Sequence, residues 1–168
     1  MTKFYKVSLN EFKKGYKKIP EEFQKMTAEE AYERLALPKR ATKGSAGYDF
    51  VSPISFFLYP GETILIPTGI RCEMHENQVL MLFPRSGMGF KYRLQLNNTV
   101  GIIDSDYYYS DNEGHIMAKI TNDSNEGKTL EVKAGDAFMQ GVFVHFDITD
   151  DDDADGIRNG GFGSTSKK

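Results

Sequence analysis

The chain has 168 residues, of which 39% are hydrophobic, and its formal net charge at pH 7 is -3. This length suits one domain that can bury a core, and the hydrophobic content is typical of a globular rather than a disordered chain. The net negative charge argues against a protein that binds polymeric nucleic acid, although a local basic pocket could still hold a small anion.

Cysteine usage and hydropathy predict a cytoplasmic protein. Cys72 is the single cysteine, so it cannot form an intramolecular disulfide, and a reducing compartment is the simplest interpretation. We expect Cys72 to be a small buried hydrophobic residue. No apolar segment of a signal peptide is visible, and no apolar stretch approaches the roughly 20 residues that a membrane-spanning helix needs. We therefore expect no membrane contact.

The first 36 residues differ from the rest of the chain because they are rich in Lys and Glu. Thr27 and Glu30 have the spacing of a capping box, in which a hydroxyl and a carboxylate cap the start of a helix. This predicts a short helix that Pro38 ends. Residues 11–18 are predicted to form an earlier helix. We expect residues 1–36 to be a partly helical N-terminal extension, a packing appendage rather than a catalytic unit.

From Ser45 onward the sequence has the pattern of β-strands. Short apolar runs are separated by turn residues such as Pro60-Gly61, and strands do not alternate with helices. This pattern predicts an all-β fold, a jelly-roll-like barrel or sandwich, over residues 37–148. The expected strands are residues 54–58, 63–66, 79–83, 116–120, 129–132 and 141–146.

Residues 149–168 combine an acidic run with a glycine-rich end. Four consecutive carboxylates, Asp150 to Asp153, are typical of a solvated, self-repelling linker, with direct metal binding as the alternative. The glycine-rich segment after them contains Arg158 and Phe162 and cannot build a core. We expect a flexible C-terminal arm whose residue types suit an anion and an aromatic surface.

Residues 84–91 contain the parts of a phosphate-binding loop. Arg85 and Lys91 supply positive charge, Ser86 supplies a hydroxyl, and Gly87 lets backbone N–H groups approach a ligand. The order of residues differs from that of a Walker A loop, and an ordinary loop is the alternative.

Two carboxylates stand out for their surroundings. Asp49 follows a run of small residues that allows close backbone approach but alone indicates only a turn. Asp104 is flanked by apolar residues, so it can be partly buried and held by hydrogen bonds. A carboxylate positioned in this way can take a proton from water. A turn residue is the alternative for Asp104 as well.

In their order along the chain, these segments resemble the five motifs of the trimeric dUTPase family, and the resemblance spans residues 37–166. The residues that carry it are Ala46-Gly47-Tyr48-Asp49, Pro84-Arg85-Ser86-Gly87, Gly101 to Tyr107, Gly135 to Gln140, and Arg158 to Thr165. The resemblance implies a jelly-roll subunit and a homotrimer whose three active sites lie at subunit interfaces. It also implies hydrolysis of dUTP to dUMP and pyrophosphate, which keeps uracil out of DNA and supplies dUMP for dTMP synthesis.

The resemblance further implies a role for each matching residue. Asp104 would activate the water that attacks the α-phosphorus, and Asp49 would contact, through water, a Mg²⁺ ion held mainly by the substrate phosphates. The implied substrate-binding residues are Arg85, Ser86, Gly87 and Gln140 around the phosphates, Asn98, Gly101 and Ile103 in the hairpin that holds uracil, Tyr107 against the deoxyribose, Phe162 and Gly163 over the base, and Arg158, Ser164 and Thr165 on the γ-phosphate.

The chain departs from the family pattern in two places. Ala137 stands where the fourth motif usually carries an Arg, although Gln140 is kept. The hairpin region from Tyr107 to Gly114 is longer than usual. Neither departure removes a catalytic group.

Two alternatives use the same scaffold. A dCTP deaminase shares the fold and some motifs but would use a Glu to activate water, whereas this chain has Asp104 in the corresponding segment and Phe162 in the arm. A protein-binding regulator could use the longer hairpin or the N-terminal extension to contact a regulatory partner protein.

The three histidines, His75, His115 and His145, share no metal-ligand spacing. We expect them to be ordinary surface or strand residues.

Overall fold

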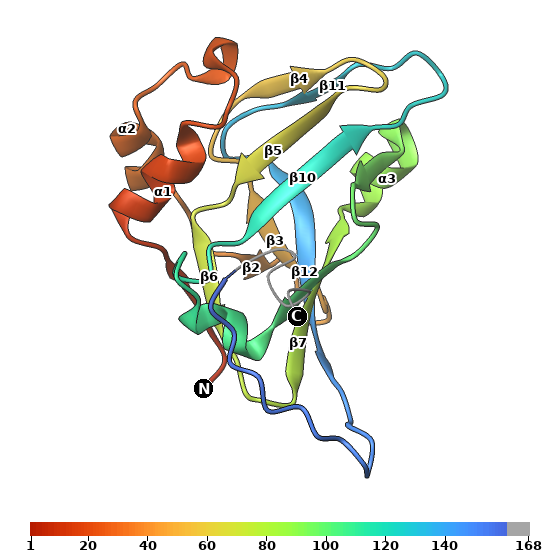
Figure 1. Cartoon of the computed structure of the whole chain (residues 1–168). Coiled ribbons are helices and arrows are strands. Elements are labelled where there is room, and N and C mark those ends of the chain that lie inside the picture. Colours follow the sequence, from red (N-terminus) through yellow and green to blue (C-terminus); the bar gives the residue numbers. More distant parts are fainter. Residues whose placement is uncertain (161–168) are drawn as a thin grey trace.

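The computed structural model describes residues 1–160, in which antiparallel strands are flanked by short helices (Figure 1). The strands are β1 (Lys3–Lys6), β2 (Lys39–Arg40), β3 (Tyr48–Val51), β4 (Phe56–Leu58), β5 (Thr63–Pro67), β6 (Ile70–Glu73), β7 (Gln78–Pro84), β8 (Leu94–Leu96), β9 (Gly101–Asp104), β10 (Met117–Asn122), β11 (Leu130–Val132) and β12 (Ala137–His145). The helices are α1 (Leu9–Tyr16), α2 (Ala28–Glu33) and α3 (Ser86–Tyr92), with 3₁₀ turns η1 (Glu21–Phe23) and η2 (Ser105–Tyr109).

The strands of this region form antiparallel sheets with the orders β2-β3-β12-β7-β9, β5-β10-β8, β11-β4 and β1-β6. Along β7, buried side chains alternate with half-buried ones, as expected for a strand with a core on one face. Leu80 on β7 and Phe138 and Met139 on β12 are 0% exposed. The paired strands β7 and β12 therefore form the centre of the core.

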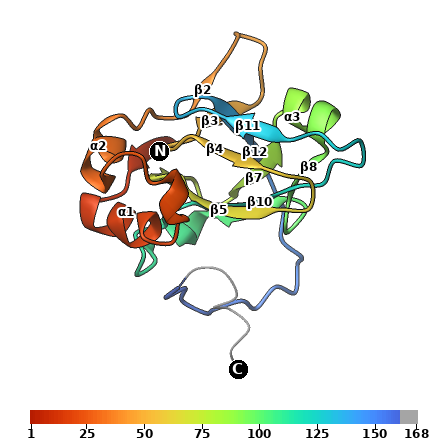
Figure 2. The same ribbon diagram turned by 90° about the horizontal axis from the view of Figure 1, so that it is seen from above.

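The N-terminal residues are attached to this body through a strand and two helices. β1 pairs with β6. Ser8 caps α1 by accepting a hydrogen bond from the Glu11 N–H, and Thr27 and Glu30 form the expected capping box at α2. Figures 1 and 2 show α1 and α2 on the side of the molecule opposite α3. The extension is thus part of the folded structure.

The chain after β12 runs away from the sheets and returns toward η2 (Figure 1). The Asn159 carbonyl accepts a hydrogen bond from the Asp111 N–H at 3.4 Å, and the Gly160 carbonyl accepts one from the Ser110 hydroxyl at 3.3 Å. The start of the C-terminal arm therefore lies against the turn that follows η2.

The β-rich fold of antiparallel sheets confirms the expectation from the sequence, as do the capping box of α2 and the burial of Cys72. Burial also raises the pKa of the Cys72 thiol to about 12. The strand β1 was not expected, and Ser86 to Lys91, which we interpreted as a loop, lie in helix α3. The domain boundaries at residues 36 and 148 stay predictions.

The expectation for His115 was wrong. This side chain is 1% exposed and lies between η2 and β10, in neither a strand nor the surface. Its burial results from α1, because the Phe12 ring lies 6.5 Å from the imidazole and Glu11 lies beside it. None of the helices in residues 1–160 has the length and apolar character needed to cross a bilayer.

Candidate active site

The first half of the candidate site lies where β7 ends and α3 begins. Asp49 on β3 pairs with Gln140 on β12, and Gln140 pairs with Phe83 near the end of β7. Ser86 and Gly87 follow at the start of α3. This register gathers residues from β3, β12, the start of α3 and the segment 41–47 around a pocket of about 350 Å³. The pocket is lined by Ala41, Ser45, Ala46, Gly47, Asp49, Arg85, Ser86, Gly87, Gln140 and Val142.

Polar contacts fix the side chains of this first half. The Arg85 Nε atom lies 3.3 Å from Asp49 Oδ1, and Gln140 Nε2 donates a hydrogen bond to the Pro84 carbonyl at 3.3 Å. A Cβ at Gly47 would lie 2.2 Å from the Gln140 Oε1 atom, so a larger residue there would displace the Gln140 amide. Cation, hydroxyl, amide and carboxylate therefore face one small space, an arrangement suited to a polyphosphate and a divalent ion.

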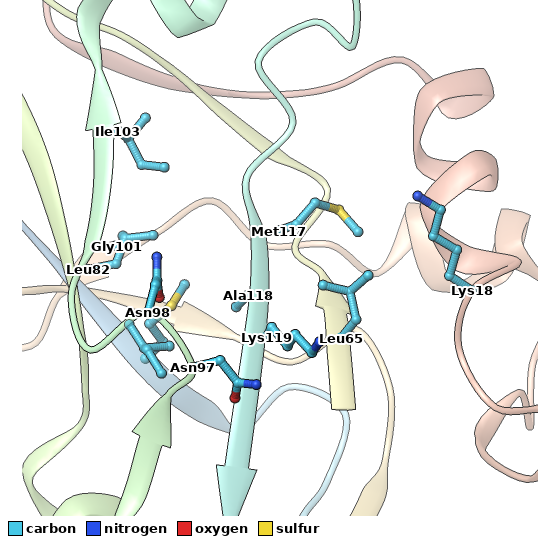
Figure 3. Close-up of a pocket in the computed structure, with 12 residues that line it drawn as sticks. Lys18, Leu65, Leu82, Asn97, Asn98, Gly101, Ile103, Met117, Ala118 and Lys119 are labelled. Carbon is cyan, nitrogen blue, oxygen red and sulfur yellow. The ribbon is translucent and has the colours of Figure 1, made fainter. Parts of the chain in front are cut away.

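The second half of the candidate site is a pocket of about 450 Å³ beside the segment from β8 to β9 (Figure 3). We call this segment the hairpin, although β8 pairs with β10 and β9 pairs with β7. Its lining is mainly apolar, and it includes Asn98, Gly101 and Ile103 from the hairpin and Met117 from β10. A side chain at position 101 would collide with the neighbouring strand, because a Cβ there would lie 2.8 Å from the Leu82 Cβ. The pocket thus offers an apolar wall with a polar amide at one edge, as a base and sugar require.

Asp104 stands at the end of β9, and its side chain is 48% exposed. Arg158 contacts it directly: Arg158 Nη2 lies 2.5 Å from Asp104 Oδ2, and Arg158 Nε lies 2.8 Å from Asp106 Oδ1. These contacts place the first arm residues over the carboxylate. An exposed carboxylate at a strand end can reach water, which general-base chemistry requires.

Tyr107 is buried next to this carboxylate. Its hydroxyl donates a hydrogen bond to the His115 carbonyl at 2.6 Å and accepts one from Asn112 Nδ2 at 2.9 Å. Burial raises the pKa of the Tyr107 hydroxyl, so the group stays protonated near neutral pH. The longer turn after Tyr107 therefore anchors the ring in place.

Asp104 and Ser86 lie toward opposite ends of β7 within one chain. Asp104 pairs with Val79 near the start of β7, whereas Ser86 follows Pro84 at its end. The five steps from Val79 to Pro84 span roughly 17 Å at the usual rise of a strand. A single copy of the chain therefore keeps its Asp104 far from its own Ser86.

The structure thus brings the expected residues together in separate groups. One group is Asp49, Arg85, Ser86, Gly87 and Gln140; a second is Asn98, Gly101 and Ile103; a third is Asp104, Tyr107 and Arg158. Phe162, Gly163, Ser164 and Thr165 lie outside the described residues. The roles given to all these residues stay predictions.

Sequence reasoning missed one residue at the second pocket. Lys18, which follows α1 in the N-terminal extension, also lines this pocket. It lies about 80 positions before Asn98 in a segment that looks like an ordinary charged helix. Only the docking of α1 against the strands brings it there, so no local signal in the sequence could have found it.

The side chains that line the first pocket include an oxygen ligand suited to a divalent metal ion. Within residues 1–160, His, Cys, Asp and Glu side chains form no group of three or more that could hold a metal. Asp49 nevertheless faces the first pocket with one carboxylate. Because Mg²⁺ is usually held by one or two carboxylates together with substrate phosphates and waters, this donor fits a Mg²⁺–nucleotide complex.

The chain is similar to known proteins over most of its length. The family model described as dUTPase matches residues 33–166. The deoxyuridine 5'-triphosphate nucleotidohydrolase of Lactococcus lactis subsp. lactis (strain IL1403) is 42% identical over 134 residues, which are 78% of this chain and 88% of that protein. The protein of the same name from Hahella chejuensis (strain KCTC 2396) is 42% identical over 144 residues, 80% of this chain and 89% of that one.

A solved structure is similar over the same part of the chain. The crystal structure of dUTPase from Streptococcus mutans superposes with a TM-score of 0.60 at 38% sequence identity, and the match covers 79% of this chain and 96% of that one. The likeness in sequence and fold spans both halves of the candidate site. This chain therefore belongs to the dUTPase family.

Proposed function

We propose that the protein hydrolyses dUTP to dUMP and pyrophosphate. The observation that carries the proposal is the first pocket, in which Asp49, Arg85, Ser86, Gly87 and Gln140 meet although they come from three separate segments of the sequence. The family membership of residues 33–166 and the substrate named for the Lactococcus lactis relative support dUTP as the nucleotide.

The first pocket would bind the triphosphate. Arg85 brings positive charge, and the Ser86 hydroxyl and Gly87 N–H can donate to phosphate oxygens. Asp49 would hold Mg²⁺ through water together with those phosphates, and the ion would neutralise part of their charge. Gln140, fixed by the Pro84 carbonyl, would orient the α-phosphate.

The second pocket would bind the nucleoside. Asn98 can exchange hydrogen bonds with uracil, and Gly101 at the start of β9 packs closely on Leu82 of β7. This close packing would leave no room at the base for the methyl group of thymine. Cytosine would be rejected because its reversed donors and acceptors leave buried polar groups unpaired, at a cost of ~1–3 kcal/mol each.

Asp104 would take a proton from the water that attacks the α-phosphorus, while pyrophosphate leaves in line with the attack. In the structure this carboxylate is held by Arg158. The proposed γ-phosphate contact of Arg158 therefore requires the guanidinium to exchange carboxylate oxygens for phosphate oxygens, both of which suit its planar donors. Most of the rate enhancement would come from positioning and charge neutralisation.

If Asp104 and Ser86 act on the same α-phosphate, each active site is shared between two copies of the chain in a homotrimer. Asp104 and Ser86 are separated by roughly 17 Å or more along β7 in one chain, yet both must act on the same α-phosphate. A second copy must therefore supply one of them. Closed cyclic assemblies place the same pair of surfaces together at every interface, which would give three equal sites.

The substrate assignment is tested by incubating the protein and Mg²⁺ with dUTP, dCTP and dTTP in turn. We expect pyrophosphate and a nucleoside monophosphate from dUTP alone. Release of ammonia from dCTP would instead identify a deaminase, and equal hydrolysis of dUTP and dTTP would contradict the exclusion of the thymine methyl group.

The shared site is tested by mixing subunits. Asp104→Asn and Ser86→Ala should each be nearly inactive. After the two variants are unfolded and refolded together, about one quarter of the sites should combine an intact Asp104 with an intact Ser86 from another copy. Recovery of activity in the mixture supports the proposal, whereas an inactive mixture of well-folded trimers would show that each chain builds its own site.

A further inference from the structure

Helix α1 of the N-terminal extension is packed directly against the segment that leads into the second pocket. Gly15 is essential for the close approach, because a Cβ there would lie 2.7 Å from the Pro67 Cβ and 3.2 Å from His115 Cε1. Met117, the first residue of β10 and part of the pocket lining, lies 3.5 Å from the same position. The end of α1 therefore has a defined place beside the pocket.

This packing brings Lys18 to the rim of the pocket. The Lys18 N–H donates a hydrogen bond to the Gly15 carbonyl at 3.0 Å, which continues the turn at the end of α1. Figure 3 shows the Lys18 side chain on the far side of Met117 from the hairpin residues Asn98 and Gly101. Within residues 1–160 the Lys18 ammonium group has neither a hydrogen-bond acceptor nor a carboxylate partner.

An unpaired ammonium at the edge of an apolar pocket is suited to a ligand that carries its negative charge outside the pocket. The lining holds Lys119 as a second cation and otherwise mostly apolar residues, so it offers an anion no competing carboxylate. A lysine is a flexible point charge that can reach an anion without fixed geometry. A deoxyuridine nucleotide has this distribution of charge, with a neutral base and an anionic polyphosphate.

We propose that Lys18 is a further substrate-binding residue, an inference that rests on the proposed function. Its ammonium group would attract the polyphosphate of a nucleotide whose base and sugar lie in the second pocket. Lys18 lies outside residues 33–166, the range that matches the family model. The extension of this chain would then add a cation to a site whose other residues come from the family core. Lys119, in contrast, lies on β10 within that core.

The test compares Lys18 with its neighbour Lys17, which is also exposed but does not line the pocket. Lys18→Ala should raise KM for dUTP about 2- to 5-fold, as expected for loss of one solvent-exposed charge interaction, and Lys18→Glu should raise it further. Because such a charge would bind the nucleotide equally in the ground state and the transition state, kcat should stay within about 2-fold of wild type. Lys17→Ala and Lys17→Glu should leave both constants unchanged.

Binding measurements identify the part of the nucleotide that Lys18 attracts. Calorimetry of wild type and Lys18→Ala with deoxyuridine, dUMP and a non-hydrolysable dUTP analogue should show a loss of affinity that grows with the number of phosphates and shrinks in high salt. An equal loss for deoxyuridine would assign Lys18 to the base or sugar and overturn the proposal. Circular dichroism and the trimer state should match wild type in all four variants.

The Lys18 variants and the wild-type protein test two different statements, the role of Lys18 and the hydrolysis of dUTP. If wild type and the Lys17 variants hydrolyse dUTP and the Lys18 variants do so with the same KM, only the role of Lys18 is wrong. If wild type neither hydrolyses nor binds any deoxyuridine nucleotide, the proposed function and the role of Lys18 both fail.

Discussion

Acidification should destabilise the protein through His115, a buried histidine that α1 covers. Burial lowers the pKa of His115 from 6.5 to about 4, and the charge of Lys18 acts in the same direction while Glu113 opposes it. The imidazole is therefore neutral near pH 7 and accepts a hydrogen bond at Nε2 from the Gly69 N–H at 2.9 Å. Its 3.9 Å contact with Glu11 is then not an ion pair.

Proton binding at His115 determines the direction and the size of the change in the free energy of unfolding with pH. Below about pH 6.5 the unfolded chain binds a proton at His115 that the folded chain does not bind until about pH 4. The free energy of unfolding is thus fully retained above pH 6.5 and falls as the pH drops toward 4. At pH 5 the loss from this one group is about 2 kcal/mol. Burial acts to raise the pKa of Glu113, but hydrogen bonds from Ser8 and the charge of Arg71 lower it below its ordinary value of 4.5. The stability that Glu113 contributes is therefore present above pH 4.5 and is lost only below it.

Urea unfolding at pH 7.5 and pH 5, at fixed protomer concentration, measures how much free energy of unfolding is lost between the two pH values. His115→Gln keeps an acceptor for the Gly69 N–H but does not titrate, so its loss of unfolding free energy between the two pH values should be smaller by about 2 kcal/mol. His75→Gln is the matched control, because His75 is exposed, and it should behave like wild type. Equal losses in wild type and His115→Gln would refute the reasoning. If His115→Gln does not fold, an NMR titration that places the wild-type His115 pKa at 6 or above would refute it instead.

Three further predictions concern the catalytic carboxylate, the arm and the extension. Asp104→Asn should lower kcat by about 10²- to 10⁴-fold while the dUTP analogue still binds, and wild-type turnover in this variant would remove Asp104 from the mechanism. Deleting the chain from Arg158 onward should leave a folded protein with greatly reduced pyrophosphate release; a truncated chain that cannot fold would make the arm structural. Gly15→Val should lower the free energy of unfolding by about 1–3 kcal/mol because its side chain meets Pro67, whereas Gly44→Val, with no atom within 4 Å of the added Cβ, should stay close to wild type in chemical denaturation.

The sequence predicted the strands best where one face of a strand is buried. Leu80 and Leu82 alternate with half-buried residues on β7, and this period of two is visible in the sequence itself. The capping box of α2 was equally readable, because Thr27 and Glu30 act on each other within one turn. Helix α3 was missed because Gly87 and the other glycine of Ser86 to Lys91 favour a loop by propensity.

The parts that depend on pairing between distant segments were not predictable. The β1 strand pairs with β6 about 65 residues later in the chain, and nothing local specifies that partner. The burial of His115 and the place of Lys18 both follow from the docking of α1, which is set by packing around Gly15. The residues of the first pocket were named from their motifs, but the sequence could not show that Asp104 lies at the other end of β7 from them.

This separation divides the proposed site into halves that depend on different parts of the chain. The half that contains Ser86 lies at the end of β7 with β3 and β12. The half that contains Asp104 borders the turn from Tyr107 to Met117, and the second pocket joins Met117 to Leu82 on β7 and Met139 on β12. The N-terminal residues are attached to that turn, because the Ser8 N–H donates to the Glu113 carboxylate at 2.9 Å and α1 packs on His115. Substitutions in α1 should therefore change nucleoside binding and the positioning of Asp104. Strand β1 belongs to the other half, because the Phe4 ring lies 5.4 Å from the Tyr48 ring beside Asp49 and 5.6 Å from the Phe143 ring on β12. Since each complete site would combine one half from each of two copies, α1 would adjust affinity for the nucleotide through the half that supplies Asp104.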